Sequence, residues 1–142
     1  RVDDVINTAG HRLSTGRLEE VINEHGNVVE SAVVAYLDDV RGECPLAFCV
    51  LRGRDHTTLS VEEHTALSKS INDKVRADVG AFAKLHGVIF LERLPKTRSM
   101  KILRGTIKSI ANGLPYKVPA TIEDLQSLEE VREAVTQWRM AQ

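Results

Sequence analysis

The segment from residue 93 to 117 carries basic side chains and no acidic ones, and it is the strongest candidate for chemistry in the sequence. Hydroxyl groups lie among its charges at Thr97 and Ser99, and an apolar pattern at helical spacing follows from Ile102. Ammonium groups, hydroxyls and the free amides at a helix start all bind phosphate or carboxylate oxygens. The segment therefore predicts an anion site formed among seven basic residues: Arg93, Lys96, Arg98, Lys101, Arg104, Lys108 and Lys117.

The charge of the whole chain limits the kind of anion. The formal net charge is only −1, so the basic segment is a local concentration, and it favours a small anionic ligand over a nucleic acid. A second interpretation stays open, in which a small module binds RNA or an acidic protein through Arg98, Lys101, Arg104 and Lys108. The content of 4% aromatic residues and the lack of a stacking motif count against single-stranded RNA.

Several other kinds of site find no support in the sequence. The five histidines never fall three or four residues apart, so no zinc site is predicted on a single helix. The sequence lacks GxSxG, GxxxxGK[ST] and GxGxxG, the patterns of serine hydrolases, P-loop enzymes and dinucleotide-binding folds. Cys44 and Cys49 match no CxxC motif, and we interpret them as reduced thiols in a reducing compartment.

The elements that would position such a site alternate between short strands and helices. Residues 2–9 and 11–14 predict a β-hairpin that turns at Gly10, and residues 28–37, 46–51 and 88–91 predict three strands. Helices are expected after Ser14, after Ser60 and in the basic segment as far as Ala111, and Ser60 with Glu63 forms a capping box. The expected fold is α+β: a small three-stranded sheet packed with helices and preceded by a short β-hairpin.

Length and composition are those of one globular domain. A chain of 142 residues with 42% hydrophobic residues can bury a conventional core, and no apolar run is long enough to predict a membrane span. No signal peptide is recognisable either. The sequence begins at Arg1 without a methionine, and we expect it to be a fragment of a longer protein.

Two segments at opposite ends of the chain carry a specific family likeness. These are RVDDVINTAGHR at residues 1–12 and PKTRSMK at residues 95–101, together with NGLPYK at 112–117 and TIED at 121–124. They resemble the C-terminal lobe of short-chain acyl-CoA synthetases of the adenylate-forming superfamily, in the acetate and propionate branch. The resemblance covers nearly the whole chain, with residues 1–122 as the mobile lobe and 123–142 as a C-terminal tail expected to be helical.

The resemblance implies a two-step reaction. A short-chain carboxylate and ATP give acyl-adenylate and diphosphate, and CoA then displaces AMP. It implies Mg²⁺, and as a partner the large N-terminal domain of the same polypeptide, against which the small lobe rotates between the steps. The implied compartment is the cytoplasm or the mitochondrial matrix, with no nucleic acid bound. A related enzyme that loads a carrier protein is the remaining alternative within this superfamily.

The resemblance also assigns roles to individual residues. Lys101 matches the lysine that reaches the carboxylate and α-phosphate during adenylation, where a compact ammonium can offset the charge that develops. It is also a candidate for reversible acetylation by a lysine acetyltransferase and a deacetylase. Asp3 matches the hinge aspartate, and Arg1 and Arg12 match arginines that approach ATP or the adenylate.

The remaining matches concern CoA and the metal. Ala9 and Gly10 match a hairpin turn whose backbone comes close to CoA, and Arg76 matches an arginine that contacts the 3′-phosphate of CoA. The implied Mg²⁺ ligands, largely through backbone oxygens, are Asn23, His25 and Val28.

Two residues depart from the family pattern. Arg17 is interpreted as a tolerated surface change. Met100 stands where the lysine loop of the family usually has glycine, and a β-carbon restricts the backbone there. We therefore expect Met100 to slow adenylation and to leave the thioester step unchanged.

Overall fold

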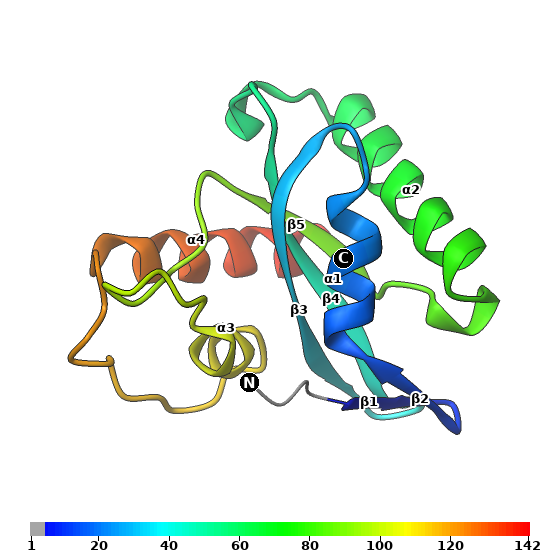
Figure 1. Cartoon of the computed structure of the whole chain (residues 1–142), viewed down its shortest axis with the longest axis horizontal. Coiled ribbons are helices and arrows are strands. Elements are labelled where there is room, and N and C mark those ends of the chain that lie inside the picture. Colours follow the sequence, from blue (N-terminus) through cyan, green and yellow to red (C-terminus); the bar gives the residue numbers. More distant parts are fainter. Residues whose placement is uncertain (1–4) are drawn as a thin grey trace.

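The computed structural model describes residues 5–142, and within them it confirms the predicted α+β class (Figure 1). A hairpin of strands comes first, then a helix, a long strand pair, a second helix, a fifth strand and two further helices. The elements are β1 (Val5–Thr8), β2 (His11–Ser14), α1 (Thr15–Asn23), β3 (Val28–Asp38), β4 (Gly42–Leu51), α2 (Val61–Asp78), β5 (Gly87–Leu91), α3 (Arg104–Ala111) and α4 (Gln126–Met140), with short 3-10 turns at His56–Thr58 and Ala81–Ala83.

The sheet joins all of the strands that the structure describes. Along the hydrogen-bonded path their order is β2-β1-β4-β3, and β5 pairs in parallel with β4. Strands β3 and β4 form a long antiparallel ladder from Val28↔Leu51 to Asp38↔Gly42. The N-terminal hairpin does more than precede this sheet, because Thr8 in β1 pairs with Gly42 at the start of β4.

Alternation along the central strand divides the interior into two cores. Ala47, Cys49 and Leu51 of β4 face one core, which α1 and α2 cover, whereas Leu46 and Phe48 face the other. Helices α3 and α4 cover this second core, on the other side of the sheet in Figure 1. A sheet buried on both faces accounts for the uninterrupted apolar runs in β3 and β4.

Local capping follows the sequence. The Ser60 hydroxyl accepts a hydrogen bond from the Glu63 amide, and the Glu63 carboxylate accepts one from the Ser60 amide, so the predicted capping box is confirmed. Cys44 and Cys49 are buried free thiols. Burial raises the pKa of the Cys49 thiol to about 12, which keeps it protonated and unreactive. No helix in residues 5–142 is both long and apolar enough to cross a membrane.

The outer edge of β3 is closed by side chains. The Val33 amide donates to Oε2 of Glu19, and the Leu37 amide donates to Oδ1 of Asn112. The Asn112 Nδ2 group donates in turn to the Ala35 carbonyl oxygen, at 2.9 Å. These bonds occupy backbone groups that an edge strand would otherwise offer to another chain.

We expect Asn112→Ala to lower the free energy of unfolding by roughly 1–3 kcal/mol, because it leaves polar groups at the β3 edge and the Lys108 carbonyl of α3 without this partner. Urea denaturation of the chain measures this change. Asn27→Ala is the matched control, since Asn27 is exposed, and it should shift stability by less than about 0.5 kcal/mol. Equal losses in both variants would contradict the proposed role of Asn112.

Candidate functional site

The loop that carries Lys101 is a tight turn of three residues. The Thr97 amide donates to the Lys101 carbonyl oxygen at 2.9 Å, and the Met100 amide donates to the Thr97 carbonyl oxygen at 2.8 Å. The Lys101 amide donates to the Thr97 hydroxyl, which also contacts Ser99. Met100 closes the turn with φ of 68°, in the left-handed region that favours glycine.

This backbone geometry determines which residue type is most stable at position 100. Left-handed backbone costs a residue with a β-carbon roughly 1–2 kcal/mol, whereas glycine adopts it freely. Met100→Gly should therefore raise the free energy of unfolding by about 0.5–1 kcal/mol, after the entropy that glycine gains in the unfolded chain is subtracted. Chemical denaturation tests this. Ser99→Gly is the control, because the neighbouring Ser99 does not have a positive φ, and this variant should be less stable than the wild type. A loss of stability in both variants would show that the backbone at Met100 is not strained.

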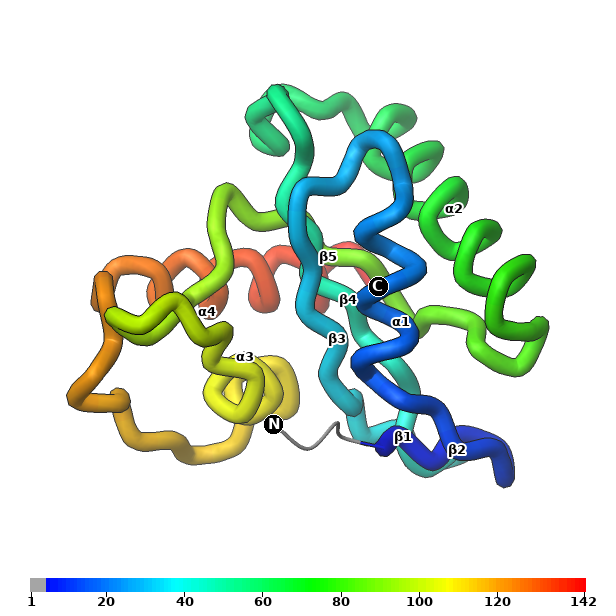
Figure 2. The backbone as a smooth tube through the Cα atoms, in the orientation of Figure 1, coloured from blue at the N-terminus to red at the C-terminus, as the bar shows by residue number. Residues whose placement is uncertain are grey.

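The Lys101 turn is fixed to a segment far along the chain. Lys96 bridges Ile102, and Thr97 bridges Ile122 in an antiparallel manner. The Arg98 amide donates to the Thr121 carbonyl oxygen at 2.8 Å, and the Glu123 amide donates to the Lys96 carbonyl oxygen at 2.9 Å. The tube in Figure 2 follows these two segments side by side. The motif at 95–101 and the motif at 121–124 therefore form one structural unit.

Lys101 itself offers an exposed ammonium group. Helix α3 begins at Arg104 with Leu103 as its N-cap, so Lys101 lies in the turn before the helix rather than within its first turn. The described part of the chain supplies no salt-bridge partner for Lys101, Arg98, Lys108 or Lys117. Lys101 is thus a charge held on an ordered backbone and open to a ligand.

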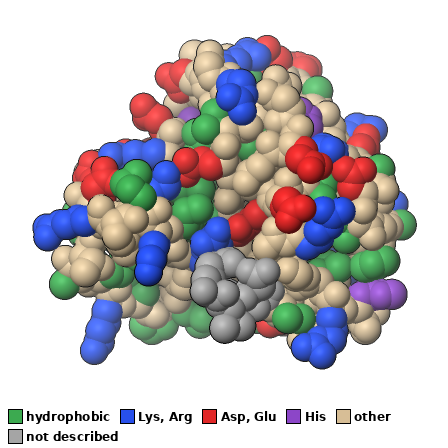
Figure 3. All heavy atoms as spheres, viewed as in Figure 1, with side chains coloured by type: hydrophobic (Ala, Val, Ile, Leu, Met, Phe, Trp, Pro, Cys, Tyr) green, Lys and Arg blue, Asp and Glu red, His purple; other side chains and the backbone are tan. Residues whose placement is uncertain are grey.

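Three other charges of the basic segment are already neutralised. Arg93 pairs with Glu130 and Asp124. Hydrogen bonds to Glu130 first, and then to Asp124, raise the pKa of Arg93, and the bond from Arg93 lowers the pKa of Asp124. Lys96 pairs with Glu30 at 2.9 Å, and Arg104 pairs with Glu19 at 2.6 Å. Exposed basic side chains still project from this side of the molecule, to the left in Figure 3. The segment is therefore less basic than its sequence indicates, which weakens the RNA interpretation.

The N-terminal hairpin forms a second exposed feature. Its turn residues Ala9 and Gly10 have φ of 48° and 84°, both positive, as the type I′ turns of two-residue hairpins require. Both residues are exposed, and a β-carbon built at Gly10 would meet no atom within 4 Å. Gly10 is thus explained by its backbone angle, and the space beside the turn is free for a ligand.

The hairpin and the C-terminal end of α2 lie on the same side of the molecule in Figure 1. Arg12 is exposed on β2, opposite Asn7, and Arg76 is exposed in the last turn of α2. The His11 ring stacks on Phe82 with ring centroids 4.3 Å apart, so the hairpin adjoins the segment that follows α2. In Figure 1 the hairpin lies at the lower right, whereas the 96–101 loop lies at the far left.

The expected Mg²⁺ ligands lie between the end of α1 and the start of β3, and two of their side chains make hydrogen bonds within the domain. The Asn23 side chain accepts a hydrogen bond from Ser31, and the His25 ring contacts Ser70 and the Asn27 amide. The Arg52 guanidinium donates to the carbonyl oxygen of Val28 at 3.3 Å and competes there with a metal ion. Burial first, and then the charge of Lys74, lower the pKa of His25. Binding of Mg²⁺ through the backbone oxygens of these residues stays a prediction, and we derive no step through a metal here.

Comparison with known proteins identifies the domain. The sequence model of the family described as AMP-binding enzyme C-terminal domain matches residues 17–101, more than half of the chain. The chain belongs to this family. The 96–101 turn that carries Lys101 closes the matched region, which also contains most of α1, the long strand pair and α2. Arg1 and Asp3, the expected ATP-binding and hinge residues, lie outside the described residues.

Several relatives of this AMP-binding C-terminal domain are named as acyl-CoA or acetyl-CoA synthetases. It is 44% identical over 137 residues to human acyl-CoA synthetase short-chain family member 3, mitochondrial, covering 96% of the chain and 19% of that protein. It is 41% identical over 134 residues to acetyl-coenzyme A synthetase of Pyrobaculum aerophilum, again 19% of that protein, and 94% of the chain. A solved acyl-CoA synthetase from Brucella canis superposes with a TM-score of 0.67 at 32% identity, over 77% of the chain and 19% of that structure. The chain spans about a fifth of the length of these relatives.

Sequence reasoning missed the carboxylates of this C-terminal domain that hold its basic segment. Glu19 lies 85 residues from Arg104, and Glu30 lies 66 residues from Lys96. Each acidic residue stands in an apolar context, Glu19 after Leu18 and Glu30 after Val29. The one available signal was the position of each glutamate beside apolar residues, because a carboxylate that is largely buried requires a basic partner from elsewhere in the chain.

Proposed function

We propose that the chain acts as the C-terminal domain of a short-chain acyl-CoA synthetase, with a large N-terminal domain of the same polypeptide as its partner. One observation carries this proposal: the turn with Lys101 and the hairpin with Ala9 and Gly10 lie at opposite ends of one α+β domain. A domain with two functional ends can serve two steps if it rotates against its partner between them. The names of the relatives indicate synthesis of short-chain acyl-CoA. The substrates in this proposal are ATP, CoA and a short-chain acid such as propionate or acetate.

The Lys101 end suits the adenylation step. When a carboxylate oxygen attacks the α-phosphorus of ATP, negative charge builds up on the phosphoryl oxygens. An ammonium group that is already positioned stabilises that charge without reorganisation. The paired backbone of Thr97 and Lys101 holds the base of the side chain, and the exposed ammonium has no carboxylate to neutralise it among the described residues.

The same exposure makes Lys101 a substrate for modification. Acetylation by a lysine acetyltransferase would remove the charge, and a deacetylase would restore it. We propose this as reversible control of the first step. Arg12, exposed on β2, is proposed to approach ATP. The relatives that are named mitochondrial favour the mitochondrial matrix, with the cytoplasm as the alternative compartment.

The hairpin end suits the thioester step. The turn at Ala9 and Gly10 presents backbone without a large side chain, which allows the pantetheine chain of CoA to pass close to it. Arg76, in the last turn of α2, offers an exposed guanidinium fork, which suits the 3′-phosphate of CoA.

Substitution of Arg76 tests this assignment. In the full-length enzyme, Arg76→Ala should raise the KM for CoA roughly tenfold, the scale of one lost charge-assisted hydrogen bond. The KM for dephospho-CoA, which lacks the phosphate in question, should stay within about twofold of the wild-type value. Lys69→Ala is the control, because Lys69 is also exposed on α2. An equal rise for both thiols would make Arg76 a structural residue and remove it from the CoA site.

A further inference from the structure

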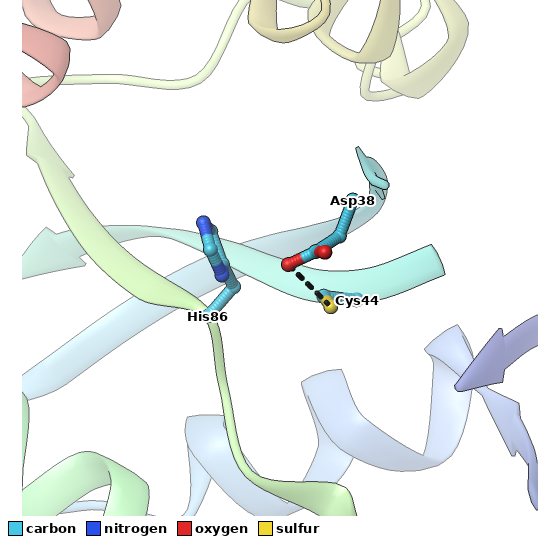
Figure 4. A group of neighbouring side chains, drawn as sticks. All are labelled: Asp38, Cys44 and His86. Carbon is cyan, nitrogen blue, oxygen red and sulfur yellow. Dashed lines mark hydrogen bonds between the residues drawn. The ribbon is translucent and has the colours of Figure 1, made fainter. Parts of the chain in front are cut away.

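Three side chains that no step of the proposed reaction uses converge at one end of the sheet. Asp38 ends β3, Cys44 lies near the start of β4, and His86 directly precedes β5 (Figure 4). One ligand atom from each residue lies within 4.8 Å of the other two. The Cys44 thiol, which is buried, donates to Oδ2 of Asp38 at 3.9 Å. Nitrogen, sulfur and oxygen donors in one cluster are the set that zinc accepts.

The positively charged side chain of Arg41 already contacts two of these three groups. Nε of Arg41 lies 3.7 Å from Oδ2 of Asp38, and Nη2 lies 3.2 Å from Nδ1 of His86. A guanidinium group can only donate hydrogen bonds, so Nδ1 of His86 must accept with its lone pair. The contact therefore selects the neutral tautomer of His86 with its proton on Nε2. The lone pair of Nδ1 therefore points toward the space beside Asp38 that the Arg41 guanidinium now occupies, and a bound metal ion would take the same place.

The protonation states of the oxygen and nitrogen donors suit a metal. Hydrogen bonds from the amides of Val40 and Arg41 lower the pKa of Asp38, which keeps the carboxylate ionised at neutral pH. Burial, and secondly the charge of Arg41, lower the pKa of His86, which keeps the imidazole neutral. Burial raises the pKa of Cys44, so its thiol carries a proton that a metal must displace.

Neighbouring groups fix two of the donors in place. The His86 ring stacks on Tyr36, with centroids 4.7 Å apart and an interplanar angle of 16°, and meets the edge of Trp138. Oδ1 of Asp38 accepts from the two backbone amides of the β3–β4 turn, which leaves Oδ2 facing the cluster. Such supporting contacts orient metal ligands in known sites. The Arg41 side chain is 37% exposed and can therefore move outward into solvent.

We propose that Asp38, Cys44 and His86 bind one Zn²⁺ ion, which takes the place of the Arg41 guanidinium. The Cys44 thiol gives its proton to solvent and binds as a thiolate, Arg41 turns outward still protonated, and a water completes four-coordination. Zinc bonds of about 2.0–2.3 Å set tetrahedral donor atoms roughly 3.3–3.8 Å apart, so side-chain rotations must draw the cluster together by about an ångström. The ion would join the ends of three strands and stabilise the domain.

Calorimetric titration of the reduced chain with Zn²⁺ alone tests the proposal. We expect one ion per chain with a Kd at or below about 10 μM. Titrations in buffers of different ionisation enthalpy should show release of about one proton per ion. Titration with Co²⁺ should add a thiolate-to-metal absorption band. This band identifies the Cys44 ligand directly in the wild-type chain, so the result does not depend on whether a variant folds.

Variants then assign the ligands. Cys44→Ser and His86→Gln should each weaken Zn²⁺ binding at least about tenfold, and Arg41→Gln should tighten it roughly tenfold because a competing cation is removed. Cys49→Ala is the matched control, because Cys49 is the other buried thiol and lies outside the cluster. The proposal is overturned if the wild-type chain binds no Zn²⁺ in this range or if Co²⁺ gives no thiolate band. It is equally overturned if Cys44→Ser binds as tightly as wild type, or if Arg41→Gln fails to tighten binding.

Discussion

Lys101→Ala in the full-length enzyme should slow formation of the acyl-adenylate by about 10²- to 10³-fold, the usual effect of removing one preorganised group that stabilises developing charge. The change removes an exposed ammonium and no hydrogen bond of the turn, because the bonds of Lys101 within the turn come from its backbone. The fold should therefore be unaffected. Single-turnover release of diphosphate from ATP and propionate measures the step without interference from CoA.

A control from the same basic segment makes this test specific. Lys117→Ala removes another exposed lysine without a salt-bridge partner among the described residues, and it should change the adenylation rate by less than about twofold. Similar losses in the two variants would show that the segment acts through its overall charge. A loss below about tenfold for Lys101→Ala would exclude it as the adenylation lysine.

The second large effect concerns stability. Glu19→Ala should lower the free energy of unfolding by about 3 kcal/mol, because it removes a nearly buried carboxylate and the hydrogen bonds that this carboxylate accepts from Arg104 and from the backbone of β3. Glu19 is only 6% exposed and accepts from both Nε and Nη2 of Arg104, as well as from the Val33 amide of the β3 edge. Denaturant unfolding of the chain, followed by circular dichroism, measures the loss.

The neighbouring glutamate provides the control for this prediction. Glu20 is exposed and pairs with Arg17 on the surface of α1, so Glu20→Ala should cost less than about 0.5 kcal/mol. The pair of Glu19 and Arg104 also ties α1 to the first residue of α3, three positions after Lys101. If Glu19→Ala were as harmless as Glu20→Ala, the buried pair would not hold these elements together.

Local chemistry in the sequence was enough to predict most elements. The capping box of Ser60 and Glu63 set the start of α2, and the turn at Gly10 set the hairpin, because both depend on neighbours within a few residues. The glycine-like backbone of the Met100 position was also foreseen from the resemblance, and φ of 68° there agrees with it.

Long-range pairing could not be predicted in the same way. Seven positive charges in one segment indicated an open anion site. Three of them are paired instead: Arg93 with carboxylates of the C-terminal region, Lys96 with one from β3, and Arg104 with one from α1. Which charges stay free is decided by contacts between residues 31 to 85 positions apart, and composition carries no information about them. The cluster of Asp38, Cys44 and His86 was hidden for the same reason, since no helical spacing connects its members.

The most direct test of two functional ends is the thioester half-reaction, started from supplied propionyl-adenylate and CoA below saturation. In the full-length enzyme, Lys101→Ala should form propionyl-CoA at the wild-type rate, within about twofold, although it fails in adenylation. Arg76→Ala should be slower in this assay roughly in proportion to its raised KM for CoA, and normal in adenylation. If Lys101→Ala instead lost the thioester step as severely as the adenylation step, the two ends would not divide the reaction between them.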